Sequence, residues 1–394
     1  MSGRARSHRR SPREIGRRLL LAAASGLLVL AAADGLMRWL DYRPTQVPLF
    51  EERPDGVSYQ LRPGASVHRT VDGVSVSLVT NSLGMRGPEL DPPSDRPRVA
   101  LMGDSFTFGL WAEDAEHTFA GVLQQHLGRD RLEVLNFGVP GYGFKEITIA
   151  LAQDVLPLHP RWVVLVSYNG NDFLDTWTGL IRYRVSANGS LERDTAAIAD
   201  KLPMHLQREH PIPHSRFIDR SPVVMLARVA ARWALPGRAP PLDPGDSWNS
   251  DLYWSRAEYT DFAVQARDGA LAELARIDAL CREQDARLVL VAMPYLQQVM
   301  QPERFGDELD IDVPQRYLAG FADAHGVPFL DLRPGMAQAA QRLFIEGEGH
   351  MTNAGHAVVG RLLGDFLAPL IAPPLDSVDV APGEQHQGQA QEQR

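Results

Sequence analysis

The chain has 394 residues, of which 44% are hydrophobic and 23% charged, an ordinary composition for a globular protein. Its net charge of −9 is unevenly distributed, because the first 18 residues contain seven arginines and one glutamate, so the rest of the chain is strongly acidic. A basic amino-terminal segment followed by an acidic chain is not typical of a nucleic-acid-binding protein, so no nucleic-acid partner is expected.

An apolar stretch, "LLLAAASGLLVLAAADGLMRWL", follows the arginines over residues 19–40. Its uninterrupted part, residues 19–33, is short for a bilayer span, but Asp34 and Arg38 can reach the interface and lengthen it. Arginines before an apolar segment keep the amino terminus in the cytoplasm. We therefore predict a cytoplasmic tail over residues 1–18 and a transmembrane anchor over 19–40. The body would lie on the periplasmic side of a bacterial inner membrane. Cleavage as a signal peptide is the alternative.

Residues 41–95 are rich in proline and glycine and contain short alternating pieces such as "GVSVSLVTN". They are predicted to form a strand-bearing extension packed on the main domain. The single cysteine, Cys281, lies in a helical pattern and is predicted to be buried. Because no cluster of cysteines and histidines has the spacing of a zinc site, neither a metal nor a cofactor is expected.

A regular alternation of strands and helices begins near residue 96. Five apolar runs are typical of buried strands: "RPRVALMG", "LEVLNFGVPGYG", "RWVVLVSYNGND", "RLVLVAMP" and "VPFLDL". Helical patterns separate them, which indicates an α/β domain over residues 96–372, with a parallel sheet between two helical layers. Residues 173–255 interrupt the pattern and are predicted to be an insertion that follows the third strand block. Residues 373–394 are polar and are predicted to be disordered.

Polar groups capable of chemistry follow the predicted strands. Asp104 and Ser105 come after the first strand, Gly141 after the second and Asn171 after the third, while His350 precedes the last helix. Because parallel strands end at one edge of the sheet, these groups should meet there. A serine, a histidine and amide donors form the minimum set for nucleophilic acyl transfer. Ser105 alone could equally be a helix N-cap.

Taken together, these blocks resemble the SGNH (GDSL-type) hydrolases, which are serine esterases and acyltransferases on a flavodoxin-like α/β sheet. The resemblance covers residues 96–371 apart from the insertion. "MGDSFTFG" places Ser105 at the nucleophile, and "GHMTNAGH" places His350 at the general base. "NFGVPGYG" and "NGNDF" place Gly141 and Asn171 at the oxyanion hole, together with the Ser105 N–H.

The sequence departs from the family pattern at two blocks. Asn169 stands where the third block usually has glycine. The family's acid is usually an aspartate two or three residues before the histidine, whereas this chain has Gly347 and Glu348 there, with Glu346 one step further back. Glu348 is assigned the role of orienting His350, with Glu346 or a backbone carbonyl as the alternatives.

Three further residues are assigned supporting roles. Asp104 and Asp172 are expected to brace the turns that carry Ser105 and Asn171. Arg86, in "TNSLGMRGPE", lies in a stretch that resembles membrane-anchored envelope members of the family. It is expected either to contact an anionic or sugar substrate or to form a surface salt bridge. The tryptophans of "LDTWTG" and "DSWNSDLYW" are candidates for stacking on sugar rings.

The resemblance implies an extracytoplasmic serine esterase that removes an acyl group, acetyl first of all, from a carbohydrate ester through an acyl-serine intermediate. Its expected partners are the membrane, an acylated small molecule or polysaccharide, and polysaccharide-modifying proteins. Two alternatives stay open. An O-acetyltransferase would use the same residues with a sugar hydroxyl as acceptor. A catalytically silent carbohydrate-binding module would keep only the fold.

Overall fold

The computed structural model describes ten stretches of the chain, which are residues 12–39, 49–53, 59–71, 74–90, 96–179, 183–185, 191–193, 251–339, 341–345 and 349–371. The candidate acids Glu346 and Glu348 lie outside the described residues, as do most of the predicted insertion and the predicted carboxyl-terminal tail.

Five parallel strands form the central sheet. They are β5 (Arg98–Gly103), β6 (Glu133–Gly138), β7 (Trp162–Tyr168), β10 (Arg287–Met293) and β11 (Phe329–Asp331). Their order is β11-β10-β7-β5-β6, so the first strand in the chain lies between the second and the third. This is the flavodoxin-like order, and its crevice for ligands lies at the carboxyl ends of the strands where the order reverses. The five predicted strands and the α/β fold are confirmed.

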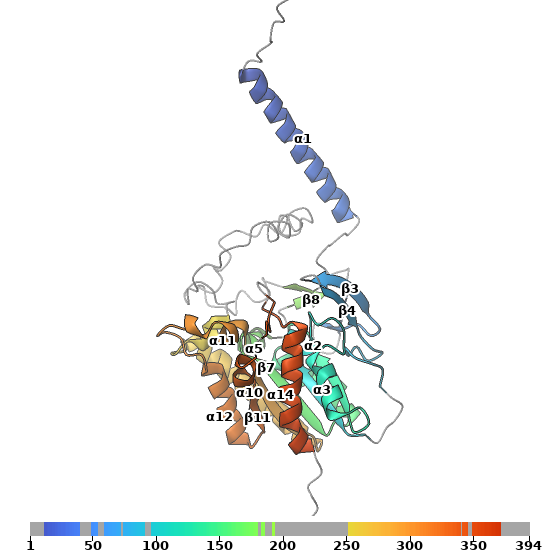
Figure 1. The fold of residues 1–394 in the computed structure, drawn as a ribbon, viewed down its shortest axis with the longest axis vertical. Coiled ribbons are helices and arrows are strands. Elements are labelled where there is room, and N and C mark those ends of the chain that lie inside the picture. The colour runs from blue at the N-terminus through green and yellow to red at the C-terminus, as the bar shows by residue number, and fades with distance from the viewer. Residues whose placement is uncertain are drawn as a thin grey trace, which may run out of the picture.

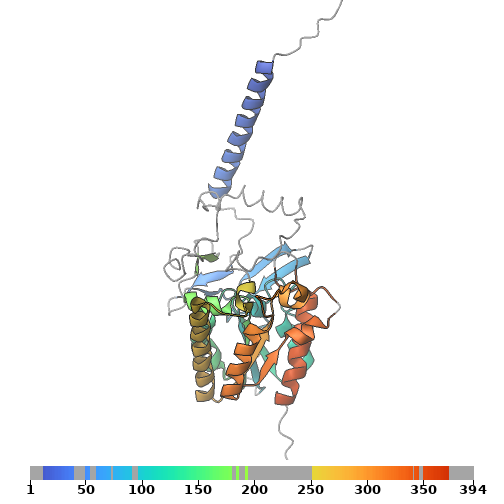
Figure 2. The same cartoon turned by 90° about the vertical axis from the view of Figure 1, so that its left-hand side faces the viewer.

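Helices and single helical turns surround the sheet. They are α2 (Ser105–Phe108), α3 (Phe119–Leu127), α4 (Phe144–Ala150), α5 (Asp172–Thr178), α10 (Asp261–Glu283), α11 (Leu296–Met300), α12 (Val313–His325), α13 (Arg333–Ala337) and α14 (Asn353–Ile371), with a π-helical turn at Leu151–Val155 and 3-10 turns at Leu156–Leu158, Asp251–Ser255 and Pro302–Arg304. Alternate residues of β5 point to opposite faces: Ala100 and Met102 pack with α4, α5 and α10, whereas Val99 and Leu101 pack with α3 and α14. The sheet is therefore the middle of three layers (Figure 1 and Figure 2).

The residues before the sheet form two antiparallel ribbons, β1 (Phe50–Glu52) with β2 (Tyr59–Leu61), and β3 (Ser66–Val71) with β4 (Val74–Val79). Tyr59 and Leu78 belong to the same buried cluster as Met102 of the sheet. A further ribbon, β8 (Tyr183–Val185) with β9 (Leu191–Arg193), lies close to the first. In Figure 1 the labelled strands β3, β4 and β8 lie at the same end of the domain as α2 and α5. The amino-terminal ribbons thus lie at the carboxyl edge of the sheet.

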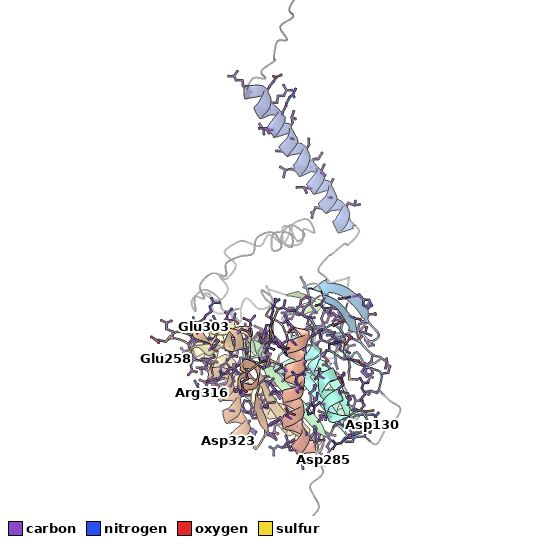
Figure 3. The ribbon with its side chains drawn as sticks, viewed as in Figure 1. Asp130, Glu258, Asp285, Glu303, Arg316 and Asp323 are labelled. Carbon is purple, nitrogen blue, oxygen red and sulfur yellow. The ribbon has the colours of Figure 1, made fainter. Side chains whose placement is uncertain are left out.

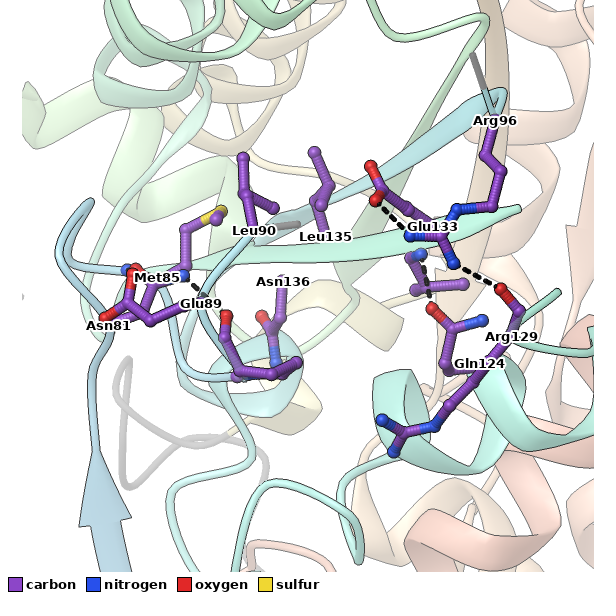
Figure 4. Close-up of a pocket in the computed structure, with 13 residues that line it drawn as sticks. Asn81, Met85, Glu89, Leu90, Arg96, Gln124, Arg129, Glu133, Leu135 and Asn136 are labelled. Atoms are coloured by element: carbon purple, nitrogen blue, oxygen red, sulfur yellow. Dashed lines mark hydrogen bonds and ion pairs between the residues drawn. The ribbon is translucent and has the colours of Figure 1, made fainter. Parts of the chain in front are cut away.

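The segment after β4 borders the edge strand β6 and leaves a cavity of about 170 Å³ between them (Figure 4). Polar groups around this cavity are largely paired with one another. The Arg96 guanidinium donates to the Glu133 carboxylate, and the Gln124 side chain accepts from the Val134 N–H. Gln124 thereby covers part of an edge that would otherwise expose unpaired backbone groups. This cavity lies beside β6 and does not include Ser105.

The amino-terminal helix α1 (Pro12–Trp39) is long and apolar enough to cross a membrane. Its span Gly16–Leu36 has a mean hydropathy of 2.0, and none of it is buried against the rest of the chain. Helix α14 passes the same test of length and composition, but 44% of it is buried, as expected for a core helix of a globular domain. The apolar face of α1 therefore has no protein surface to cover it within the described residues.

The structure places both ends of the predicted insertion in the core. Helix α5 contains the buried Phe173 and Leu174, and Trp254 packs edge-on against Phe173. Trp254 is fully buried and cannot stack on a sugar, while Trp177 packs edge-on against Phe262. The prediction of sugar stacking is therefore wrong for Trp254, because its ring fills the interior.

Several acidic side chains lie on the surface at one end of the body. Figure 3 labels Asp130, Asp285 and Asp323 at the end of the domain opposite the ribbons, near the amino ends of β6, β10 and β11. All three side chains are exposed. The acidic groups at this end are therefore distant from the edge that carries Ser105.

Candidate active site

Ser105 is the first residue of the short helix α2, directly after β5. The turn between them is tight, because a side chain at Gly103 would collide with the Thr107 side chain and the Val166 carbonyl. The Asp104 carboxylate accepts from the Phe106 N–H at 2.9 Å and so caps the helix. Asp104, not Ser105, is the N-cap, which excludes the simple capping role considered for the serine.

The Ser105 hydroxyl lies 2.9 Å from the His350 ring nitrogen Nε2. His350 comes from the segment before α14, 245 residues further along the chain. Helices α3 and α14 pack together and bring this segment to the carboxyl edge of the sheet. The distance is that of a hydrogen bond between a nucleophile and its general base.

Two aromatic rings contact the imidazole of His350, and a third stacks behind one of them. The ring of Phe106 stacks on it with centroids 5.1 Å apart and planes at 22°, and Phe106 stacks in turn on Tyr168, 4.0 Å away. Trp111 lies edge-on to His350 at 6.1 Å. The sequence alone predicted no role for Phe106 or Tyr168 in holding the imidazole. The aromatic residue directly after the serine was the available signal of this stack.

Gly141 and Asn171 flank Ser105 from either side, since β5 lies between β6 and β7. Gly141 has a φ of +84°, a conformation that favours glycine. Within the described residues its N–H donates to no protein acceptor. Asn171 is the N-cap of α5, yet its side chain makes no capping bond, and its Oδ1 is buried without a partner in the described part of the chain. The Gly141 N–H and the Asn171 side chain are therefore not engaged in hydrogen bonds that stabilise their own turns.

The two supporting aspartates lie in the turns they were expected to brace. Asp172 is buried, and its carboxylate accepts from the Tyr168 N–H at 2.8 Å, which ties α5 to the end of β7. Burial raises the pKa of Asp104 to about 6, against hydrogen bonds from Phe106 and Ser105 that lower it. A carboxyl group that titrates near pH 6 thus lies next to the candidate nucleophile.

A second histidine, His356, is buried behind the site. Its Nδ1 accepts from the Phe119 N–H at 3.3 Å, so that nitrogen carries no proton. Burial, with smaller contributions from the nearby Arg86 and His350, lowers the pKa of His356 to about 3. His356 is therefore a neutral structural group.

Arg86 is neither a substrate contact nor a surface ion pair, so both expectations are wrong. It is only 1% exposed, and its guanidinium donates to the backbone carbonyls of Phe108, Gly109, Ser77 and Ala112. Phe108 and Gly109 lie at the carboxyl end of α2, Ser77 lies in β4, and Ala112 lies in the loop after α2. Arg86 thus fastens the extension to the loop behind Ser105. A buried arginine that donates to distant backbone carbonyls leaves no sequence signal that distinguishes it from an exposed one.

The remaining site predictions concern Asn169, the acid and metals. Asn169 is buried, with its side chain 3.4 Å from Gln298, so it fills the position where glycine was expected. Glu348 and Glu346 lie outside the described residues. Among the residues that the structure describes, no group of three or more histidine, cysteine or acidic side chains could hold a metal ion.

Comparison with known proteins identifies the domain. Residues 101–358 match the model of the GDSL-like lipase/acylhydrolase family. The chain belongs to this family. The match begins within β5 and ends within α14, so it includes residues of all five sheet strands and both the Ser105 and His350 segments. As a GDSL-like hydrolase, the protein is an enzyme that cleaves esters.

Solved structures resemble the chain only distantly. An acetylxylan esterase from Geobacillus stearothermophilus is 13% identical with a TM-score of 0.38, covering 69% of this chain and 94% of its own. An α/β hydrolase from the metagenome of Lake Arreo is 15% identical with a TM-score of 0.38, covering 70% of this chain and 96% of its own. No curated protein sequence matches the chain.

Proposed function

We propose that this GDSL-like hydrolase is a serine esterase that removes a short acyl group, acetyl first of all, from a carbohydrate ester outside the cytoplasm. The observation that carries the proposal is the 2.9 Å contact between Ser105 Oγ and His350 Nε2. A catalytically silent binding module would have no reason to keep that pair in hydrogen-bond contact. The stacked rings of Phe106 and Tyr168 fill space beside the pair and so favour a small acyl group.

In the proposed mechanism His350 Nε2 takes the proton of Ser105 as the hydroxyl oxygen attacks the ester carbonyl. The tetrahedral intermediate then collapses, the bond to the alcohol oxygen breaks, and the imidazolium returns the proton to that alcohol. Water, deprotonated by His350, attacks the acyl-serine and releases the acid and the free Ser105. Each half of the reaction transfers one proton to the base and back.

The negative oxygen of both intermediates needs donors that are fixed before the reaction. The N–H groups of Ser105 and Gly141 and the Asn171 amide are proposed to supply them. Loss of one such donor typically costs about 2.7–4 kcal/mol of transition-state stabilisation. Glu348 is proposed to orient the imidazole, with Glu346 as the competing acid.

The location is proposed from the amino-terminal sequence. Helix α1 is apolar and unburied, and arginines precede it, a charge distribution that retains the amino terminus in the cytoplasm. The hydrolase domain would then lie on the periplasmic side, beside substrates at the envelope. Protease treatment of intact spheroplasts tests this: cleavage of the domain without lysis is expected, and full protection would contradict it.

The esterase proposal is tested with p-nitrophenyl acetate and acetylated oligosaccharides, using the full chain and its Ser105→Ala variant. Wild-type activity with a loss of at least about 10³-fold in the variant is expected, because the nucleophile is then absent. Equal, slow rates for both proteins would overturn the proposal. Glu348→Gln and Glu346→Gln, compared side by side, identify the acid as the one whose loss lowers kcat.

The acceptor is tested by product analysis with an acetyl donor and an unmodified oligosaccharide. Free acetate alone is expected for an esterase. Acetylated sugar would instead establish the O-acetyltransferase, in which a sugar hydroxyl replaces water in the second half of the same mechanism.

A further inference from the structure

The amino-terminal extension reaches the candidate oxyanion hole through one hydroxyl group. The Tyr59 hydroxyl, from β2, donates to the Pro140 carbonyl at 2.9 Å, and the contact is buried. Tyr59 lies outside the part of the chain that matches the family model, which begins at residue 101. The extension thus supplies a polar contact to a loop of the hydrolase domain.

The position of that contact gives it a consequence for catalysis. The Pro140 carbonyl and the Gly141 N–H are the two ends of one planar peptide unit. A donor fixed on the carbonyl oxygen therefore also fixes the direction of the N–H. It polarises the peptide as well, because hydrogen bonds in a chain strengthen one another, and so makes the N–H a better donor.

The surroundings leave Tyr59 little freedom to move. Its ring is met edge-on by Phe50 at 5.7 Å, by Tyr142 at 5.3 Å and by Tyr183 at 6.1 Å. The Tyr142 hydroxyl also donates to the Tyr59 carbonyl at 2.6 Å, so the loop and the strand hold each other at two points. Tyr59 is 3% exposed. Its hydroxyl is therefore a fixed donor rather than a mobile one.

The Tyr59 hydroxyl leaves no room for a side chain at position 141. A Cβ at position 141 would lie 2.8 Å from Tyr59 Oη and 2.9 Å from the Tyr183 ring. The positive φ of Gly141 turns the peptide before it so that its carbonyl meets Tyr59 while its N–H has no protein acceptor among the described residues. The carbonyl end of this peptide thus has a structural role, whereas its N–H end is available to bind a substrate.

We propose that Tyr59 is a positioning residue for the oxyanion hole, through which the extension controls the strength of the Gly141 donor. The inference rests on the proposed role of Gly141 in acyl transfer. It makes catalysis depend on a strand that precedes the family domain in the chain.

The test is Tyr59→Phe in the full chain, which removes one oxygen and keeps the packed ring. Because the Gly141 N–H is misaligned rather than lost, kcat should fall about tenfold, less than the 10²–10³-fold typical of a missing donor. KM should change less than about twofold, since the effect is confined to the transition state. A trifluoromethyl ketone, whose adduct with Ser105 carries the oxyanion, should bind more weakly by the same factor as kcat/KM falls.

A matched control is Tyr253→Phe, which also deletes the hydroxyl of a buried tyrosine, in this case one in a partly buried hydrogen bond with Thr260 at the start of α10. It should keep kcat and inhibitor affinity while losing a similar amount of thermal stability. A purely structural role for Tyr59 would lower stability in both variants and leave inhibitor affinity unchanged, and that result would overturn the inference.

The two proposals fail in distinguishable ways. Activity that disappears in Ser105→Ala but is unchanged in Tyr59→Phe would refute the role of Tyr59 and leave the serine mechanism intact. Activity that survives in Ser105→Ala would refute the serine mechanism itself. The positioning role would then be refuted with it, because the oxyanion and the inhibitor adduct both require Ser105.

Discussion

The buried histidine behind the site predicts how the fold responds to acid. His356 is 1% exposed, and its Nδ1 already accepts from the Phe119 N–H. A proton on Nδ1 would face the Phe119 N–H, which is itself a donor, so the hydrogen bond would be lost. The proton would also add a positive charge near Arg86 and His350. The folded state should therefore resist protonation that the unfolded chain accepts freely.

The size of the effect follows from the shift of the pKa of His356 from 6.5 to about 3. A pKa that is lowered by folding leaves stability intact above 6.5 and removes it as pH falls toward 3. At 1.36 kcal/mol per pKa unit, the full loss approaches about 5 kcal/mol below pH 3 and is about 3 kcal/mol at pH 4.5. Such a loss is a large part of the stability of an ordinary domain.

The perturbation is His356→Asn, because the asparagine Oδ1 can replace Nδ1 as the acceptor for Phe119 and does not titrate. Urea unfolding of both proteins at pH 7 and pH 4.5 measures the effect. Between these pH values the variant should lose about 3 kcal/mol less than the wild type. His68→Asn, at an exposed position, controls for the loss of a histidine as such. Identical pH dependence in wild type and His356→Asn would refute the reasoning.

Three further predictions concern the neighbours of Ser105. Phe106→Leu removes the ring that stacks on His350. Because an aromatic pair contributes about 0.5–1.5 kcal/mol, kcat for p-nitrophenyl acetate should fall by up to about tenfold while KM stays unchanged. The control variant Phe106→Tyr keeps an aromatic ring and should restore the rate. Asp104→Asn keeps the acceptor for the Phe106 N–H and removes a group whose pKa is raised by folding. In urea unfolding the wild type, but not the variant, should therefore lose about 3 kcal/mol of stability from this group as pH rises from about 3 to about 7. Arg86→Met leaves several buried carbonyls without a donor, at a cost of about 1–3 kcal/mol each, and should lower the free energy of unfolding by at least about 3 kcal/mol. The control Arg129→Met removes an exposed ion pair and should change the free energy of unfolding by less than about 1 kcal/mol.

The sheet was predictable because its strands are buried on both faces. After Arg98, "RVALMG" has no polar residue, and "WVVLVSY" has none before Ser167; such apolar runs are typical of strands in the middle of a sheet. The position of Ser105 followed from the same logic, since a turn after a central strand has one location in a parallel sheet. His350 followed from its motif and from the helix that begins three residues later.

The contacts of Arg86 and Tyr59 could not be predicted from the sequence. Arg86 looked like an exposed charge because nothing local distinguishes an arginine that meets solvent from one that meets carbonyls more than twenty residues away. Tyr59 gave no signal, because its partner, Pro140, lies 81 residues further along the chain. Such pairs depend on how the extension docks, which no local pattern encodes.

By itself, the sequence determined the elements and the chemistry: apolar runs that must be buried, turns that must be tight, and a serine, a histidine and amide donors in the order of the strands. The tertiary structure decided how those groups are held. Strand order brought Ser105 between Gly141 and Asn171, helix packing brought His350 within 2.9 Å of it, and the docked extension placed Arg86 and Tyr59 behind the two loops. The physical reason is range: hydrophobic periodicity and turn chemistry act over a few residues, whereas the hydrogen bonds that orient a catalytic group join segments that only the packed core brings together.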